Sequence, residues 1–240
     1  MSSHPHVAVI GFPGSNGDHD AIHSLNIDVG VDATLVDYRE TSLDGFDAVV
    51  LPGGFSYGDA LRCGAIARFA PIMTPLKEFA EDGGWVLGIC NGFQVLTEAH
   101  LLPGALLRNK TLRFHCFPCR IGVVNATWPW LSRCTEGETL TLPVAHGEGA
   151  YFVEDNTLAA LESNGQVALR YLTDHERGVS TEGNKNGSVA AIAGITNRRG
   201  NVLGLMPHPE RATNTLVGGT DGLRILTTLF DMGKAESKAS

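Results

Sequence analysis

The sequence has neither a long apolar run nor an excess of positive charge. No stretch approaches the ~18 consecutive apolar residues of a membrane-spanning helix, so we expect no membrane span. Residues 1–6 are polar and lack a basic segment followed by an apolar one, so we expect no signal peptide. The formal net charge is −8, whereas nucleic-acid-binding surfaces need an excess of Lys and Arg. These absences predict a cytoplasmic protein that binds neither membrane nor nucleic acid.

Cysteine is scarce and odd in number. Five cysteines in a chain without an export signal are expected to be free thiols rather than a disulfide framework. Cys116 and Cys119 have the spacing of half a zinc site, but no second Cys or His pair lies at a suitable distance, so we predict no metal. Glycosylation requires export, so the sequons at Asn109, Asn125 and Asn186 are expected to be chance matches.

No phosphate-binding motif is present. Residues 12–17 (FPGSNG) are glycine-rich and follow an apolar run, but they lack the Gly-Lys-Ser/Thr of a P-loop. The G-x-G-x-x-G pattern of dinucleotide-binding proteins is also missing from this position. We therefore expect this chain to bind no nucleotide or other cofactor itself.

The residues that are present suit one α/β domain over residues 1–240. A chain of 240 residues with 43% hydrophobic residues can bury roughly 70% of its unfolded surface, and no linker or repeat divides it. Short apolar runs alternate with amphipathic stretches in the first half, which predicts an open, mostly parallel sheet flanked by helices. The predicted strands are residues 6–12, 33–38, 47–54 and 85–90, and the predicted helices carry Ile22, Leu25 and Val29 or span residues 60–69, 73–82 and 93–99.

The second half of the chain has a different pattern. Residues 101–152 contain short strand-like stretches broken by Gly and Pro, and residues 170–188 are polar, as in a loop or hairpin tip. Residues 192–196 and 202–207 are apolar runs on either side of a turn sequence, which predicts a hairpin. A closing helix is expected over residues 223–230. We therefore expect extra antiparallel strands beside the parallel sheet.

The strongest local pattern is Gly88-Ile89-Cys90-Asn91-Gly92, between a predicted strand and a predicted helix. A nucleophile with glycine two residues before and after it at such a junction is typical of a nucleophile elbow. The sharp turn strains the backbone of Cys90, and the neighbouring chain leaves no room for side chains at Gly88 and Gly92. The free N–H groups of the following helix favour a thiolate. A buried structural cysteine beside two turn glycines is the alternative.

A base for Cys90 is expected at His208, in the segment Met206–Arg211 (MPHPER). Two prolines hold this segment extended, and residues two apart in an extended chain project to the same side. His208 and Glu210 can therefore face one cleft, where the carboxylate fixes the imidazole tautomer. Open parallel sheets place their sites at the carboxyl ends of strands, and this segment follows one. Alone, the segment is a weak pattern that fits an ordinary surface turn better than a site. Together with the elbow, it predicts a Cys–His–Glu triad.

Two further glycine-rich stretches follow predicted strands. Residues 51–59 (LPGGFSYGD) can supply a backbone N–H to the oxygen of a tetrahedral intermediate, and the N–H of Asn91 can supply a second. Residues 145–149 (AHGEG) set His146 and Glu148 among glycines, which suits contact with a small polar substrate. A tight turn without function remains an equal alternative for each stretch.

Taken together, these segments resemble the class I (triad) glutamine amidotransferases. The family elbow G-x-C-x-G-x-Q is present as Gly88–Gln94, and the family segment PGGFSYGDxLRxGAIA is present as Pro52–Ala67. AHGEG and MPHPER also match, in order and over nearly the whole chain. Within the family, the sequence resembles the glutaminase subunits of phosphoribosylformylglycinamidine synthase, an enzyme of purine biosynthesis. The resemblance implies a flavodoxin-like fold.

The resemblance also implies a role for each matching residue. Relatives often have cysteine where Gly17 stands, and NPNGS where residues 184–188 read NKNGS, so these two positions depart from the pattern. The implied roles are nucleophile for Cys90, general base and acid for His208, orienting partner for Glu210, oxyanion donors for Gly54 or Phe55 and for Asn91, and substrate contact for Gln94, beside His146 and Glu148.

A glutaminase of this kind implies a partner, because free ammonia protonates in water and loses its nucleophilicity. The resemblance implies a large synthetase subunit that binds ATP and Mg and converts formylglycinamide ribonucleotide to the amidine, together with a small accessory subunit. Two alternatives stay open. One is a stand-alone cysteine hydrolase of the peptidase or deglycase type, and the other is a non-catalytic regulatory module.

Overall fold

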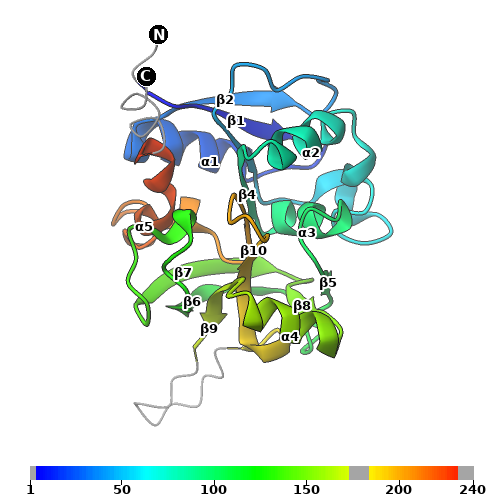
Figure 1. The fold of residues 1–240 in the computed structure, drawn as a ribbon, viewed down its shortest axis with the longest axis vertical. Coiled ribbons are helices and arrows are strands. Elements are labelled where there is room, and N and C mark those ends of the chain that lie inside the picture. The colour runs from blue at the N-terminus through cyan, green and yellow to red at the C-terminus, as the bar shows by residue number, and fades with distance from the viewer. Residues whose placement is uncertain (1–3, 173–183, 232–240) are drawn as a thin grey trace.

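The structure, a computed structural model, describes residues 4–172 and 184–231 (Figure 1). A nine-stranded mixed sheet runs through it in the order β2-β1-β3-β4-β11-β10-β9-β6-β7. Within the described residues, no helix is both long and apolar enough to cross a bilayer. The strands of the sheet are β1 His6–Gly11, β2 Asp32–Asp37, β3 Ala48–Leu51, β4 Trp85–Ile89, β6 His115–Val123, β7 Thr139–His146, β9 Val167–Tyr171, β10 Ile192–Thr196 and β11 Val202–Leu205; β5 Ala105–Leu107 and β8 Ala150–Phe152 form a separate pair.

Five strands form the parallel half of the sheet, namely β2, β1, β3, β4 and β11. Figure 1 shows α2 and α3 on one side of these strands and α1 and α5 on the other. Strands covered on both faces need apolar residues throughout, which explains the continuous apolar runs of β1, β3 and β4. The predicted parallel sheet is confirmed. The helices are α1 Asp18–His23, continued by a π-helix over Ser24–Val29, α2 Met73–Glu81, α3 Asn91–Glu98, α4 Asp155–Ser163 and α5 Leu223–Leu226.

The remaining strands are antiparallel, as expected. β10 and β11 form the predicted hairpin, and β9, β6 and β7 extend the sheet beyond it. In residues 101–152, β5 and β8 are short, with 3 residues each, as predicted. However, β6 and β7 are 9 and 8 residues long and continue through Pro118 and Pro143, so the prediction of short stretches broken by Gly and Pro is wrong for these two strands. Pro118 pairs with Pro143, β7 is the edge strand, and β6 meets β9 only at Ile121–Val123. Proline is tolerated where a strand has no neighbour that needs its N–H.

One helix prediction differs from the structure. Residues 60–69 are not a helix, because Leu61 and Gly64 have left-handed backbones with φ of 69° and 78°. Only short 3-10 turns at Ser56–Asp59 and Ala67–Phe69 remain. The predicted closing helix is confirmed: residues 223–226 (α5) and 228–231 are helical, with a single turn residue at Thr227 between them. Part of the predicted polar loop, residues 173–183, lies outside the described residues.

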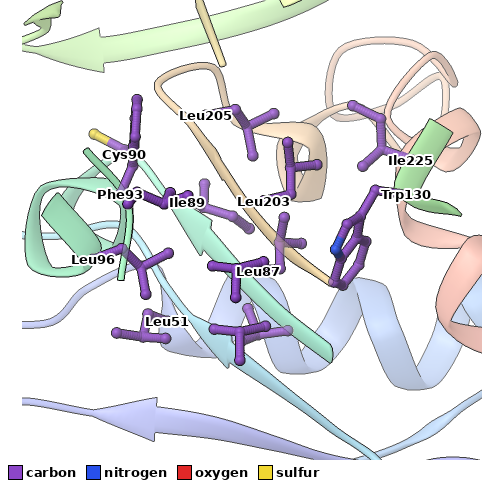
Figure 2. Close-up of a cluster of buried hydrophobic side chains, with 14 of the residues drawn as sticks. Leu51, Leu87, Ile89, Cys90, Phe93, Leu96, Trp130, Leu203, Leu205 and Ile225 are labelled. Atoms are coloured by element: carbon purple, nitrogen blue, oxygen red, sulfur yellow. The ribbon is translucent and has the colours of Figure 1, made fainter. Parts of the chain in front are cut away.

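Buried apolar side chains pack around the end of β4 and the turn that follows this strand. Leu51, Leu87 and Leu205 come from three neighbouring strands and are fully buried. Phe93 of α3 packs onto them, and Figure 2 shows Cys90 at the edge of this apolar cluster. A nucleophile at the rim of a close-packed core has a backbone that cannot easily relax.

Candidate active site

Cys90 occupies the sharp turn between β4 and α3, with φ of 50° and ψ of −102°. Its N–H donates to the Leu205 carbonyl at 2.8 Å, and its own carbonyl accepts from the Gln94 N–H at 3.2 Å. A Cβ on Gly92 would lie 2.0 Å from the Leu51 carbonyl oxygen, and a Cβ on Gly88 would lie 2.8 Å from the Gly92 carbonyl oxygen. Only glycine fits at both positions, so the predicted elbow geometry is confirmed.

His208 and Glu210 form a buried pair next to Cys90. The His208 N–H donates to the Pro143 carbonyl at 2.8 Å, and its Nδ1 lies 2.6 Å from Glu210 Oε1. The two side chains are 2% and 1% exposed. Because the Glu210 carboxylate can only accept this hydrogen bond, the His208 Nδ1 carries a proton. The His208 Nε2 has no hydrogen-bond partner among the described residues. Residues Pro209–Arg211 form a 3-10 turn rather than the extended chain predicted, and the turn still brings the carboxylate against the ring.

Gly53 lies between Cys90 and the His208 imidazole, and its lack of a side chain allows the two to lie close together. A Cβ on Gly53 would lie 2.6 Å from His208 Cε1 and 3.6 Å from Cys90 Cβ. Burial lowers the pKa of His208, but the Glu210 carboxylate and the Cys90 thiolate raise it by more, to about 10. The arrangement therefore favours an imidazolium next to Cys90, a residue type whose reactive form is the thiolate.

A pocket of about 420 Å³ opens above Cys90. It lies at the carboxyl ends of the parallel strands, where the sequence predicts a site. Asn91, His208 and Glu210 lie outside its lining. The lining residues are Gly54, Phe55, Asp59, Cys63, Cys90, Gln94, Arg108, Leu112, Arg113, Phe114, Ala145, His146, Gly147 and Glu148.

The predicted oxyanion donors lie at the start of α3 and in the loop that follows β3. Asn91 is the first residue of α3, where backbone N–H groups have no partner within the helix. On the other loop, the Phe55 N–H donates to the Gly14 carbonyl at 3.1 Å. Gly54 lines the pocket directly before it. Of the two residues predicted there, Gly54 is therefore the better placed to donate.

Gln94 bridges two walls of the pocket. Its Oε1 accepts from Asn91 Nδ2 at 2.8 Å, and its Nε2 donates to the Glu148 carbonyl at 2.6 Å. The Glu148 carboxylate accepts from the Cys63 N–H at 3.4 Å and lies 3.9 Å from Arg108 Nε. Because both ends of the Gln94 amide are engaged, this side chain ties the elbow helix to the segment of residues 145–149.

With this geometry in view, comparison with known proteins identifies the family. Residues 4–219 match the CobB/CobQ-like glutamine amidotransferase domain. The chain belongs to the class I glutamine amidotransferases. The phosphoribosylformylglycinamidine synthase subunits PurQ of Thermomicrobium roseum and Salinibacter ruber are 56% identical over 226 residues and 53% identical over 223 residues. These matches cover 94% of this chain and 95% of the first relative, and 93% and 94% for the second.

Solved structures agree with this family. A chain in the structure of PurLQS from Thermotoga maritima is 40% identical with a TM-score of 0.84, covering 95% of this chain and 98% of that one. A second Thermotoga maritima protein, a glutamine amidotransferase, shares the fold alone, at 17% identity and a TM-score of 0.55, with 98% and 93% covered. The predicted fold class is confirmed.

Asn109 organises one wall of the pocket in this amidotransferase, although its sequence context shows only a sequon. It is fully buried. Its Nδ2 donates to the Arg113 and His146 carbonyls, both at 2.9 Å, and its Oδ1 accepts from the Gly149 N–H at 3.0 Å. His146 Nδ1 lies 3.1 Å from the same oxygen. No local pattern in the sequence distinguishes such a residue, because its partners His146 and Gly149 lie 37 and 40 positions away.

His146 is held as a neutral imidazole. Burial lowers its pKa to about 3, with smaller contributions from His115 and His208. Its side chain lines the pocket with Nδ1 anchored on Asn109. A neutral ring can contact a polar substrate without adding a positive charge beside Cys90.

Charged side chains of both signs line the rest of the amidotransferase pocket. Arg108 and Arg113 flank Asn109, and Asp59 lies with Glu148. Burial, reinforced by the nearby Glu148 charge, raises the pKa of Asp59. Neither arginine nor Asp59 is among the predicted site residues. Nothing in the local sequence of the two arginines separates them from ordinary surface charges, whereas Asp59 is the aspartate of the family segment Pro52–Ala67 and could have been found from it.

The cysteines outside the site are unsuited to one shared metal. Cys116 is exposed and Cys119 is buried, since residues three apart on strand β6 point to opposite faces. Within the part of the chain that the structure describes, no group of three His, Cys, Asp or Glu residues could hold a metal ion.

Proposed function

We propose that this chain is the glutaminase subunit of phosphoribosylformylglycinamidine synthase. It hydrolyses glutamine to glutamate and ammonia and passes the ammonia to a synthetase subunit in purine biosynthesis. The observation that carries the proposal is the buried His208–Glu210 pair, 2.6 Å apart, beside a cysteine on a nucleophile elbow. The relatives at 52–56% identity named as PurQ subunits support the acceptor reaction.

The first half of the reaction forms a thioester. The Cys90 thiolate attacks the side-chain amide carbon of glutamine, and the N–H groups of Asn91 and Gly54 hold the resulting oxyanion. His208 then gives its Nε2 proton to the amide nitrogen, which leaves as ammonia. Glu210 stays ionised and holds the ring through Nδ1.

The second half releases glutamate. His208, now neutral at Nε2, takes a proton from a water molecule, whose oxygen attacks the thioester carbon. The same oxyanion donors stabilise this intermediate, and collapse expels the Cys90 thiolate. The imidazolium and thiolate are thereby restored.

The pocket charges suit a zwitterionic amino acid. Arg108 and Arg113 match the α-carboxylate of glutamine, while Asp59 and Glu148 match its α-ammonium group. His146, neutral by burial, and Gln94 hold the walls between these charges. A stand-alone peptidase would need room for a polypeptide on both sides of the scissile bond.

We also propose how the chain fits its complex. Residues 1–240 act as one glutaminase domain, without a cofactor of their own, in the cytoplasm. ATP and Mg bind the large synthetase subunit, and a small accessory subunit completes the assembly. Ammonia passes between subunits shielded from water, because the ammonium ion that forms in water is not nucleophilic.

A diazoketone that mimics glutamine tests the proposal in the assembled complex. We expect mass spectrometry to find its adduct on Cys90 and not on Cys63, which lines the same pocket. Burial raises the pKa of the Cys63 thiol far above its usual range, so it stays protonated and unreactive. An adduct on Cys63, or labelling that persists in Cys90→Ser, would contradict the assignment.

A further inference from the structure

His146 lines a second, much smaller cavity in addition to the catalytic pocket. This cavity has a volume of about 10 Å³, which is close to the space that a single water molecule needs. Tyr171 lies across it. Its remaining walls are His115, Phe117, Cys119, Val144, Lys185 and Asn186.

Two of the residues that line this cavity each carry a buried polar atom without a geometric hydrogen-bond partner among the described residues. These atoms are His146 Nε2 and Tyr171 Oη, on side chains that are 4% and 5% exposed. The nearby Asn186 amide donates from Nδ2 to the Gly149 carbonyl and accepts at Oδ1 from the Ser188 N–H. Asn186 also acts on Tyr171 as a donor, which opposes the burial that raises the pKa of Tyr171, so the hydroxyl proton of Tyr171 is still left to donate. Buried polar atoms in native proteins nearly always have a partner, protein or water.

The hydrogen-bonding character of each atom follows from its surroundings. Asn109 Oδ1 accepts from the Gly149 N–H, because Asn109 Nδ2 donates to two carbonyl groups. His146 Nδ1 must therefore donate to Asn109 Oδ1, which leaves a lone pair on Nε2. Tyr171 can donate its hydroxyl proton. One acceptor and one donor thus face the same water-sized space.

We propose that His146 Nε2 and Tyr171 Oη bind one water molecule in this cavity. The water accepts from Tyr171 and donates to His146, so both buried atoms become paired. A cation fits poorly, because the Lys185 side chain lines the same cavity. Tyr171 is therefore a positioning residue: acting through the water, it gives the His146 ring a second anchor opposite Asn109.

Crystal structures of the full chain and of Tyr171→Phe test the site without reference to activity. In the wild type we expect a water within about 3 Å of both His146 Nε2 and Tyr171 Oη. In Tyr171→Phe, which keeps the ring and removes the hydroxyl, this water should be lost or displaced. A wild-type cavity without water density, or a direct bond between the two side chains, would overturn the proposal.

Kinetics of the assembled synthase test the positioning role, which rests on the proposed function. Tyr171→Phe should raise KM for glutamine about 2- to 10-fold, the effect of one lost hydrogen bond, with kcat unchanged. The matched control is Tyr151→Phe, because the Tyr151 hydroxyl is also buried but donates to the Pro103 carbonyl at 2.9 Å, outside the cavity. Equal KM changes in both variants, or an unchanged KM in Tyr171→Phe, would refute the positioning role. A wild type without glutaminase activity would instead refute the proposed function and leave the crystallographic test intact.

Discussion

Cys90 and His208 show how single side chains gain reactivity from their neighbours. Cys90 has a positive φ in a sharp turn, and this turn leaves no room for a side chain at Gly88 or Gly92. The carboxylate of Glu210 holds His208 in one tautomer, and both side chains are withdrawn from solvent. An uncompensated charge at this depth would be costly, so the imidazolium depends on Glu210 and Cys90, which both raise the pKa of His208.

The two histidines of the site are expected to differ in role. His208→Ala should lower kcat by about 100- to 10,000-fold, because it removes the general acid and base. His146→Ala should mainly raise KM for glutamine, because that ring is a neutral pocket wall. Steady-state glutaminase assays of the complex measure both. The reverse pattern would mean that His146 is the base.

Buried, neutral His146 also predicts how stability depends on pH. Its pKa is about 3 in the folded protein against a reference value of 6.5. Between pH 6.5 and about pH 3, His146 is therefore protonated in the unfolded chain but neutral in the folded chain. The free energy of unfolding decreases as the pH falls through this range. Denaturant titrations should show a loss of up to about 1.4 kcal/mol per pH unit from this group.

The control for this prediction is a variant pair. In His146→Asn, the slope of the unfolding free energy against pH should decrease by the contribution of one bound proton between pH 6.5 and 3. His19→Asn, at an exposed position, should keep the wild-type slope. If His146→Asn kept it too, the imidazole would have to be protonated in the folded protein.

At the scale of elements, the segment of residues 56–69 is fastened to the helix that follows the nucleophile. Arg62 forms a two-pronged ion pair with Glu98 of α3, with distances of 2.5 and 2.8 Å. Gly64 lies so close to α3 that a Cβ there would be 2.8 Å from the Gln94 carbonyl carbon. The Ser56 N–H donates to Asn91 Oδ1 at 3.2 Å. These contacts therefore connect the pocket wall directly to the elbow.

Removing the charge of Glu98 tests this coupling. Glu98 is 7% exposed but Arg62 is 58% exposed, so Glu98→Gln should cost only about 1–2 kcal/mol of stability. It should also lower kcat/KM for glutamine, because Asp59 and Cys63 of the fastened segment line the pocket. Thermal unfolding and glutaminase assays measure the two effects.

Glu138→Gln is the matched control, because Glu138 pairs with Arg224 at 2.9 Å outside the pocket. It should lower stability by a similar amount and leave kcat/KM unchanged. Equal losses of activity in both variants would show that Glu98 acts through general stability alone.

At the scale of the whole molecule, apolar side chains surround the pocket mouth. Phe55 and Phe114, whose ring centroids are 6.3 Å apart, are 42% and 53% exposed, and Leu112 is 79% exposed. All three line the pocket. Exposed apolar groups gathered at one site are typical of surfaces that a partner covers. This surface suits the synthetase subunit of the proposed function.

We expect the isolated chain to have low glutaminase activity that rises when the synthetase subunit binds. Leu112→Asp should raise the partner concentration needed for activation, because a charge replaces an apolar contact. Leu216→Asp is the control, since Leu216 is 95% exposed but does not line the pocket. Full activity of the isolated wild type, or equal effects of both variants, would contradict this expectation.

The parallel strands, the elbow and the pairing of His208 with Glu210 follow from the sequence alone. These features depend on local rules: apolar runs for buried strands, glycine where the chain passes closely, and a proline-bounded segment at a strand end. Local spacing carries such information because the interacting residues lie within a few positions of one another, or at the ends of neighbouring parallel strands.

The other features depend on how distant segments pack. Residues 60–69 have helical spacing, yet Gly64 packs closely against α3 with a left-handed backbone, and Leu61 is left-handed as well, so no helix forms there. Helix α4 was not predicted, because it buries only Leu161 and so has little apolar periodicity. Asn109 gains its role from His146 and Gly149, which lie 37 and 40 positions away, and Tyr171 gains its role from a cavity that it shares with His146. Contacts between distant segments leave no trace in spacing, because each residue's environment is created only when the chain folds.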